Sequence, residues 1–342
     1  MLGLAALEDW YISRLNIKSA YLYGKLNEEI YIKQPEGFKI PRQENKVLHL
    51  WHALYRLKQA GLAWWQTLNE SIRELRFKHL KSNARIFLFK WKGSWMVVVI
   101  IYVNDALFCD SNKAIVDEVK AHFMQKWKYR DLGEACKFLC MYIHQNGHKI
   151  SINQCTYLNT VIEHYGMTNA KSEPTPLPAG YYLMPNTKSL NTVLQSRFQQ
   201  VIRSLLYLSL KTYLNIAYAV TALVHQSTNP SEDHFNKVLY ICHYLIRTQN
   251  YSLDYNGHFR LGIMACTDSN WGSDLTLCHS QTGYFFKIVG RLFSLSLHTQ
   301  KSITLSSTEA EYEILRNINL WWFQYQSGLQ TTSPMSLDLV LS

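Results

Sequence analysis

Asp105 is the residue of this sequence whose type and position best suit catalytic chemistry. Together with Asn104 it separates two apolar runs, Trp95–Val103 and Ala106–Cys109, so we expect it at a tight turn between two buried strands. A carboxylate at such a turn, joined by others from a neighbouring strand, can hold the two Mg²⁺ ions that stabilise the attacking and leaving oxygens in phosphoryl transfer. The competing interpretation is ordinary turn chemistry, because Asn and Asp are frequent in turns that bind nothing.

The segments around this turn predict a domain of mixed helices and strands over residues 1–150. Arg85–Trp91 and Trp95–Val103 are rich in β-branched and aromatic residues, and the short Lys-Gly-Ser link between them is typical of a hairpin. From Leu54 onward, apolar residues recur every three or four positions, which predicts an amphipathic helix. A second helix is expected over residues 114–127, with its apolar side chains facing inward.

The rest of the chain is predicted to hold helices first and strands afterwards. A proline-rich linker over residues 172–188 leads into it, because its prolines disfavour continuous secondary structure. Helical patterns follow over residues 197–211, 214–226 and 232–247. Strands are expected over residues 261–267, 282–289 and 292–298. A last helix opens at Ser306–Glu309 with capping-box chemistry and is expected to end before Gly328.

The composition excludes several classes of protein. With 47% hydrophobic and 18% charged residues, the 342-residue chain can bury an ordinary core, which excludes a disordered or collagen-like protein. Lys and Arg number 35 against 25 Asp and Glu, and this net charge of +10 favours a polyanionic partner such as nucleic acid. The seven cysteines include no Cys-x-x-Cys pair, which argues against a disulfide framework or zinc ribbon and favours a reducing compartment.

Nothing in the sequence predicts a membrane partner. The longest apolar run, Trp95–Val103, has nine residues, whereas a membrane span needs roughly 20. The N-terminus lacks a basic region followed by a sustained apolar stretch, so no secretory signal is expected. We therefore expect an intracellular protein of the cytoplasm or nucleus.

Several motifs, in order and spacing, resemble those of copia-type retrotransposon reverse transcriptases. Three segments are similar to the first palm motif of that family: Leu15–Gly24, Glu28–Ile32 and Gln34–Phe38. Leu54–Ala60 followed by Trp64 resembles the second motif, and Tyr102-Val103-Asn104-Asp105 resembles the catalytic Tyr-Val-Asp-Asp turn. Further segments continue the pattern: Asp131–Glu134, Phe138-Leu139, Thr175-Pro176, Arg203–Leu208 and Asn215–Val220. Thr267–Trp271 and Leu305–Tyr312 resemble the ribonuclease H region of the same polyprotein, so the resemblance runs from about residue 13 to the C-terminus.

The resemblance implies an α/β (α+β) fold in three parts. These are a reverse transcriptase palm at 1–150, a largely helical thumb or connection at 151–257, and a truncated ribonuclease H-like domain at 258–342. The implied reaction is Mg²⁺-dependent synthesis of DNA from deoxynucleotides on an RNA template with a DNA primer, with cleavage of RNA in the RNA/DNA hybrid. Fingers elements are expected upstream of the palm, and both ends of the sequence are expected to be cut from a longer polyprotein.

Two departures from the family affect the implied metal site. The family holds its palm metals with the Asp of the first motif and the first Asp of the turn, and here Asn16 and Asn104 stand at those positions. An amide oxygen can bind Mg²⁺ but adds no negative charge. At an effective dielectric near 20, a charge lost about 4 Å from a monovalent partner forfeits on the order of 4 kcal/mol. We therefore expect polymerase chemistry to be severely impaired, with Asp105 as the remaining palm carboxylate.

The resemblance also implies substrate-binding positions. Tyr21 matches the aromatic steric gate under the incoming sugar, while Lys58 and Gln59 match positions that lie against the incoming nucleotide. The alternatives are a core aromatic for Tyr21 and a solvated helix residue for Lys58. Arg56 stands where the family has Gly, a residue that permits an unusual φ, and Gly61 stands where the family has Pro, a residue that makes a turn rigid. Both departures therefore bear on the local backbone.

In the ribonuclease H-like region, Asp268 and Glu309 match two of the carboxylates that hold metal ions for RNA cleavage. Their alternatives are a strand-end turn residue and an acidic residue favoured at a helix N-terminus. Two rival hypotheses for the whole chain stay open. One is a non-catalytic nucleic-acid-binding remnant with steep salt dependence, and the other is a non-functional, marginally folded fragment, which a cooperative unfolding transition would contradict.

Overall fold

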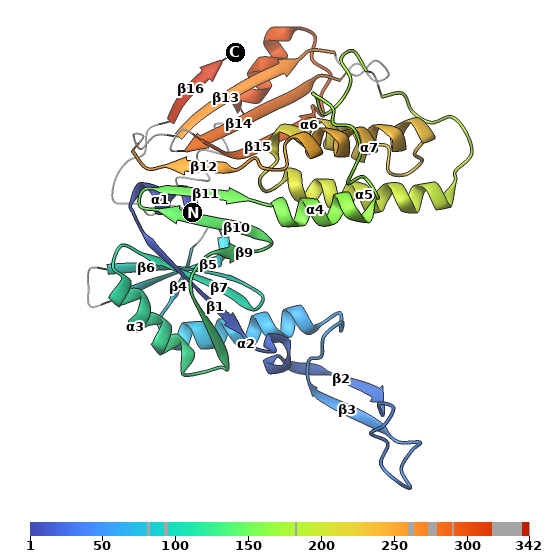
Figure 1. Ribbon diagram of the computed structural model, residues 1–342. Helices are drawn as coiled ribbons and strands as arrows, with labels where there is room; N and C mark the ends of the chain where they lie inside the picture. The colour runs from blue at the N-terminus through green and yellow to red at the C-terminus, as the bar shows by residue number, and fades with distance from the viewer. Residues whose placement is uncertain are drawn as a thin grey trace. The chain divides into compact units, whose positions relative to one another are not determined.

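The computed structural model describes residues 1–80, 83–91, 95–181, 183–258, 263–272, 279–288, 291–316 and 337–341 (Figure 1). The chain forms two compact units, each of which is described by itself. The first unit is built on Asp9–Ala135. The second contains Met1–Glu8 and most of the chain from Cys136 onward. The division into three domains stays a prediction.

A six-stranded antiparallel sheet forms the framework of the first unit, in the order β4-β5-β6-β7-β1-β8. Its strands are β1 (Tyr11–Ile17), β4 (Lys78–Leu80), β5 (Asn83–Trp91), β6 (Trp95–Tyr102), β7 (Asp105–Asp110) and β8 (Tyr129–Glu134). The predicted pairing of β5 with β6 is confirmed, although the link at 92–94 lies outside the described residues. The predicted tight turn between two apolar strands is present, because β6 and β7 pair on either side of it. Its residues are Val103 and Asn104 rather than Asn104 and Asp105, since Asp105 already pairs with Tyr102 as the first residue of β7.

Helices α2 (Ala60–Glu74) and α3 (Lys113–Met124) pack on one face of this sheet. Leu68 of α2 and Phe123 of α3 share a single buried core with alternate strand residues such as Val99 and Phe108. Because successive side chains of a strand point to opposite faces, this core takes every second residue. The intervening residues, including those of the predicted site, lie on the other face.

The predicted starting point of the first helix is wrong. The helix α2 begins at Ala60 rather than Leu54. Arg56 has a φ of 73°, which is the left-handed region, and a right-handed helix cannot pass through such a residue. Similarly, α3 ends at Met124, and Trp127 lies beyond the helix but is buried in the same core.

A two-stranded antiparallel ribbon also belongs to the first unit (Figure 1). It consists of β2 (Lys25–Lys33) and β3 (Val47–His52), and the short 3₁₀ helix η1 (Ala20–Tyr23) precedes it. Most of its side chains are exposed, including aromatic ones.

The second unit contains a four-stranded antiparallel sheet and a helical core. The sheet has the order β12-β11-β10-β9, with β9 (Lys137–Phe138), β10 (Met141–Asn146), β11 (Lys149–Asn153) and β12 (Leu253–Asn256). The helical elements are α1 (Leu2–Leu7), α4 (Cys155–His164), α5 (Thr192–Ser209), η2 (Leu214–Ile216), α6 (Ala217–Val224) and α7 (Glu232–Arg247). Helices α4 to α7 bury a common apolar core. The three helical patterns of the sequence are thus confirmed, with α5 starting earlier because Asn191 caps it.

The proline-rich segment 172–188 is hydrogen-bonded to α7 where the structure describes it. The backbone N–H of Glu173 donates to the carbonyl of His243, and Tyr240 donates to the Glu173 carboxylate. The ring of His234 contacts the carbonyl of Met184 at 2.9 Å. These contacts fix the segment along the helix although it has no regular structure of its own.

A mixed sheet follows, in the order β15-β14-β13-β16. Its strands are β13 (Ile263–Asn270), β14 (Gln281–Ile288), β15 (Arg291–Thr299) and β16 (Leu337–Leu341). The first three strands were predicted and pair antiparallel, whereas β16 pairs parallel with β13. Residues 307–316 are helical, and the predicted turn at 290 and helix end near Gly328 lie outside the described residues. No helix in the described ranges is long and apolar enough to cross a membrane.

Candidate functional site

The sheet of the first unit brings Asn16 and Asp105 together. They are direct partners in the antiparallel pairing of β1 with β7, and Tyr102 is the partner of Asp105 on the other side, in β6. Leu15 and Ala106, their sequence neighbours, are buried in the core under α2 and α3. Asn16 and Asp105 therefore lie on the face turned away from the helices. Asn104 is in the turn, where its carbonyl oxygen accepts a hydrogen bond of 2.6 Å from the N–H of Ile17.

The Asp105 carboxylate is bound by two neighbouring side chains. Its Oδ1 accepts hydrogen bonds from Arg14 Nη2 and from Asn16 Nδ2, each at 2.8 Å. The Asn16 amide must present its nitrogen, since an amide oxygen at that distance from a carboxylate would be repelled. Arg14 was not singled out from the sequence. The alternation of β1 was the available signal, because positions 14 and 16 of one strand share a face.

This donor set does not fit the divalent metal that the family implies. Mg²⁺ in such sites is held by carboxylates, and Asp105 is the one carboxylate among the three predicted palm positions. The Oδ1 oxygen of Asp105 is already paired with the Arg14 guanidinium. Within the described ranges, no group of three His, Cys, Asp or Glu side chains is placed to hold a metal ion.

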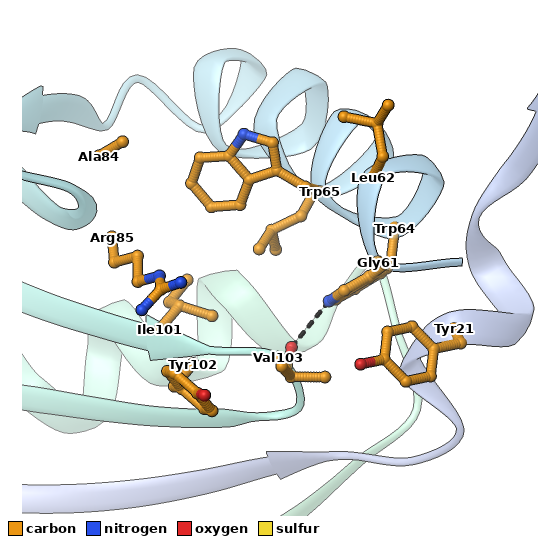
Figure 2. Close-up of a pocket in the computed structure, with 11 residues that line it drawn as sticks. Tyr21, Gly61, Leu62, Trp64, Trp65, Ala84, Arg85, Ile101, Tyr102 and Val103 are labelled. Atoms are coloured by element: carbon orange, nitrogen blue, oxygen red, sulfur yellow. Dashed lines mark hydrogen bonds between the residues drawn. The ribbon is translucent and has the colours of Figure 1, made fainter. Parts of the chain in front are cut away.

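A cavity of about 450 Å³ lies beside the turn, lined by Tyr21, Gly61, Leu62, Trp64, Trp65, Leu68, Ala84, Arg85, Ile101, Tyr102 and Val103 (Figure 2). The predicted steric gate, Tyr21, lies at its wall and packs edge-on against Tyr55 with ring centroids 5.0 Å apart. Arg85 lies over the ring of Tyr102 at 5.0 Å. The cavity therefore has mainly aromatic and apolar walls with one cation at its rim.

The predicted nucleotide-contacting pair lies at the start of α2. Lys58 is exposed, while Gln59 occupies the N-cap position without a capping hydrogen bond from its side chain, which instead donates a hydrogen bond of 2.7 Å to the Glu28 carboxylate on β2. Arg56 retains the left-handed φ that a glycine adopts without strain. Gly61 is the second residue of α2, so the helix forms without a proline there.

The second candidate site is on β13 and the helical residues 307–316. Asp268 lies on β13 and is exposed. Glu309 accepts a hydrogen bond of 2.7 Å from the N–H of Leu305, in keeping with its capping position. Glu311 accepts hydrogen bonds from the N–H of Ser269 at 3.1 Å and its hydroxyl at 2.8 Å. The structure therefore joins Glu311, and not Glu309, to the strand that carries Asp268.

Glu311 could have been found from helix periodicity. Ala310 and Ile314 are the buried positions of this helix, so residue 311 lies next to its inward stripe, whereas residue 309 is exposed. The capping-box spacing of Ser306 and Glu309 explains Glu309 locally, and the hydrogen bond of 3.1 Å from the Glu309 N–H to Ser306 Oγ bears it out.

The first unit is thus a mixed α/β fold in which Asn16 lies opposite Asp105 on the face of the sheet turned away from α2 and α3. A family model described as reverse transcriptase (RNA-dependent DNA polymerase) matches residues 1–179. The chain belongs to this family, in its copia-type branch, as its transposon relatives also show.

Three relatives illustrate the match. The chain is 30% identical, over 91% of its length, to a retrovirus-related Pol polyprotein from transposon TNT 1-94 of Nicotiana tabacum. It is 28% identical, over 98% of its length, to the one from transposon RE1 of Arabidopsis thaliana. It spans 24% and 23% of these polyproteins. A putative transposon Ty5-1 protein of Saccharomyces cerevisiae is 27% identical over 87% of the chain and 97% of its own length.

Proposed function

We propose that this chain is a copia-type reverse transcriptase scaffold whose palm is severely impaired in RNA-directed DNA synthesis. The observation that carries the proposal is the state of Asp105, which is the remaining carboxylate of the palm motifs and is bound by Arg14 and Asn16. In active enzymes of this kind the metal neutralises the charge that develops on the transferring phosphate. Here Arg14 binds the Asp105 carboxylate, and the other two palm positions are Asn16 and Asn104. No metal-dependent step is therefore assigned to this site.

Primer extension tests this proposal. The chain, at a known folded concentration, is given deoxynucleotides, Mg²⁺ and a DNA primer on an RNA template, with an active retroviral reverse transcriptase as positive control. A loss of about 4 kcal/mol corresponds to roughly a thousandfold in rate, so we expect extension to be at least that much slower than in the control. Binding of the primer-template is measured on the same sample, so that silence cannot be ascribed to lack of binding. Extension near the control rate would refute the proposal.

The mixed sheet supports a ribonuclease H origin for the C-terminal region. Its central strand β13 carries Asp268 and is flanked by an antiparallel and a parallel neighbour. Glu311 is bonded to the adjacent residue, Ser269. We propose that Asp268 and Glu311 are the carboxylates inherited from the cleavage site, with Glu309 serving the helix N-terminus. Hydrolysis of the RNA strand of a labelled hybrid, compared between the chain and Asp268→Asn, tests whether any activity persists.

A second function, binding of single-stranded nucleic acid, is favoured by an aromatic row on the β2–β3 ribbon. The rings of Tyr31, His49 and Trp51 follow one another with centroids 5.0 and 4.8 Å apart. Tyr31 is 54% exposed and Trp51 74% exposed. Bases stack on such side chains with little regard to sequence, and a chain of net charge +10 attracts the phosphates.

Fluorescence anisotropy with a labelled single-stranded RNA tests this function. Stacking is worth about 1–3 kcal/mol per base, so Trp51→Ala is expected to weaken binding by about tenfold. Phe38→Ala is the matched control, because Phe38 is 80% exposed and makes no part of the row. Affinity is also expected to fall steeply with salt. Equal losses for the two variants, or no salt dependence, would exclude the row as the binding surface.

A further inference from the structure

We infer that Arg14 takes the place of a metal ion as the counter-ion of Asp105, so that the palm stays closed to divalent metal even when its two asparagines are restored to aspartate. This inference rests on the proposed loss of the metal site and adds a third residue to its cause. The sequence departures alone suggest that Asn16→Asp and Asn104→Asp would suffice.

The first support is geometric. Arg14 and Asn16 are two positions apart on β1 and share the face on which Asp105 lies. Both donate to the same oxygen, Oδ1 of Asp105, at 2.8 Å. An arginine guanidinium thus makes a direct charge-assisted contact with the carboxylate that a palm metal requires.

The second support is burial. The side chains of Arg14 and Asp105 are 19% and 16% exposed, so water screens their attraction only partly. The Nε atom of Arg14 is buried with no hydrogen-bond partner among the described residues. The ion pair with Asp105 is therefore the main compensation that this guanidinium receives for leaving water.

The third support is the permanence of the charge. An arginine side chain stays protonated at any pH at which the protein is folded, so the ion pair cannot be dissolved by deprotonation. A divalent cation at Asp105 would have to displace the guanidinium and then remain beside it, with repulsion between the two positive groups. Two added aspartates would be attracted to Arg14 as well as to the metal.

Titration with Mn²⁺, with the free ion followed by electron paramagnetic resonance, tests the inference without any need for catalysis. Three proteins are compared: the chain itself, Asn16→Asp/Asn104→Asp, and the same pair with Arg14→Gln. We expect the double variant to bind Mn²⁺ almost as weakly as the chain, and the triple variant to bind at least about tenfold more tightly. Equal affinities for the double and triple variants would overturn the inference.

The matched control is Arg130→Gln in the Asn16→Asp/Asn104→Asp background. Arg130 is the register partner of Asn16 on β8 and is exposed, so this change removes the same charge nearby without breaking the ion pair. Its effect on Mn²⁺ affinity is expected to be below about threefold, because exposed charges are strongly screened. An effect as large as that of Arg14→Gln would reduce the inference to general electrostatics and refute it.

A double-mutant cycle in the unaltered chain covers the case in which the triple variant does not fold. Urea unfolding of Arg14→Gln, Asp105→Asn and the combined variant measures their coupling. We expect each single change to lower the folding equilibrium constant strongly. The same change, made in a chain that already carries the other, should lower that constant by a factor at least about tenfold smaller. Additive effects would show that Arg14 is not the counter-ion. Failure here leaves the proposed polymerase defect untouched, since primer extension by the unaltered chain tests that separately.

Discussion

The indole Nε1 of Trp64 donates a hydrogen bond of 2.7 Å to the carbonyl oxygen of Val103 (Figure 2). Val103 and Asn104 form the turn that precedes Asp105, and the φ of Val103, 56°, is rare for a β-branched residue. Trp64 is 2% exposed, so the bond is formed away from water. Helix α2 thereby holds a strained backbone in the position from which β7 starts.

Trp64→Phe is expected to lower the free energy of unfolding by about 1–3 kcal/mol, because it leaves the Val103 carbonyl without its partner and removes part of a buried ring. Urea unfolding followed by circular dichroism measures the change. The control is Trp65→Phe in the same helix, where a half-buried indole makes ring contacts with His79 and Phe87. A larger loss from the control would show that ring volume, and not the hydrogen bond, matters here.

Arg56→Gly is expected to stabilise the protein by up to about 1 kcal/mol. A left-handed φ costs an L-residue about 1–2 kcal/mol, and glycine escapes that cost while it loses about 0.5–1 kcal/mol to the greater freedom of the unfolded chain. The control is Lys58→Gly, at an exposed position without the positive φ of Arg56, where only the second effect operates. Thermal unfolding of both variants decides the matter. Destabilisation by both would contradict a strained backbone at Arg56.

The sequence predicts the framework of the first unit but not its fine boundaries. Apolar alternation and three-to-four spacing locate the strands and helices, because burial requires those periods. The start of α2 was misplaced since apolar spacing continues through Leu54 and Leu57, while the backbone of Arg56 breaks the helix. Pairing across distant segments, such as β1 with β7 and β8, has no local signal in a single sequence.

In the candidate site too, the sequence predicts features within one segment but not side-chain contacts between distant segments. The family resemblance implies that Asn16 and Asp105 share a site, and the pairing of β1 with β7 places them opposite each other. The contact of Arg14 with Asp105 depends on how far the Arg14 side chain reaches from β1 to β7. No sequence motif predicts this contact. Glu309 was predicted from the family motif, whereas helix periodicity favours Glu311, and the packed helix shows that Glu311 meets Ser269.

Asp131→Asn is expected to destabilise the protein by about 1–2 kcal/mol at neutral pH. The Lys120 ammonium is nearly buried and lies 2.9 Å from the Asp131 carboxylate, so the variant leaves a buried charge without its main partner. Partial burial alone raises the pKa of Asp131, but hydrogen bonds from Lys120 and the Gly133 N–H, together with the charge of Lys120, bring the pKa below its ordinary value.

The pH dependence follows from that direction. A carboxyl whose pKa is lower in the folded state adds stability above its unfolded pKa, near 3.9, and loses it as pH falls through the folded value. The gap in free energy of unfolding between the chain and Asp131→Asn should be constant above about pH 5 and narrow below it. Asp117→Asn is the control, because Asp117 is 51% exposed and 3.7 Å from Lys120. Its cost should stay below about 1 kcal/mol, and an equal cost for both variants would contradict the prediction.

The same substitution, glycine to alanine, is expected to have opposite effects at Gly24 and Gly61. A Cβ on Gly24 would lie 2.7 Å from the backbone nitrogen of Trp64 and 2.9 Å from the carbonyl carbon of Ala63, and backbone atoms cannot move aside cheaply. Gly24→Ala should therefore cost about 1–3 kcal/mol. A Cβ on Gly61 meets nothing within 4 Å, and alanine in a helix gains up to about 1 kcal/mol over glycine. Both substitutions reduce the conformational freedom of the unfolded chain in the same way, so the difference between the two variants in urea unfolding measures the close approach at Gly24. Shifts of the same sign would show that the chain at Gly24 does not pass so near to α2.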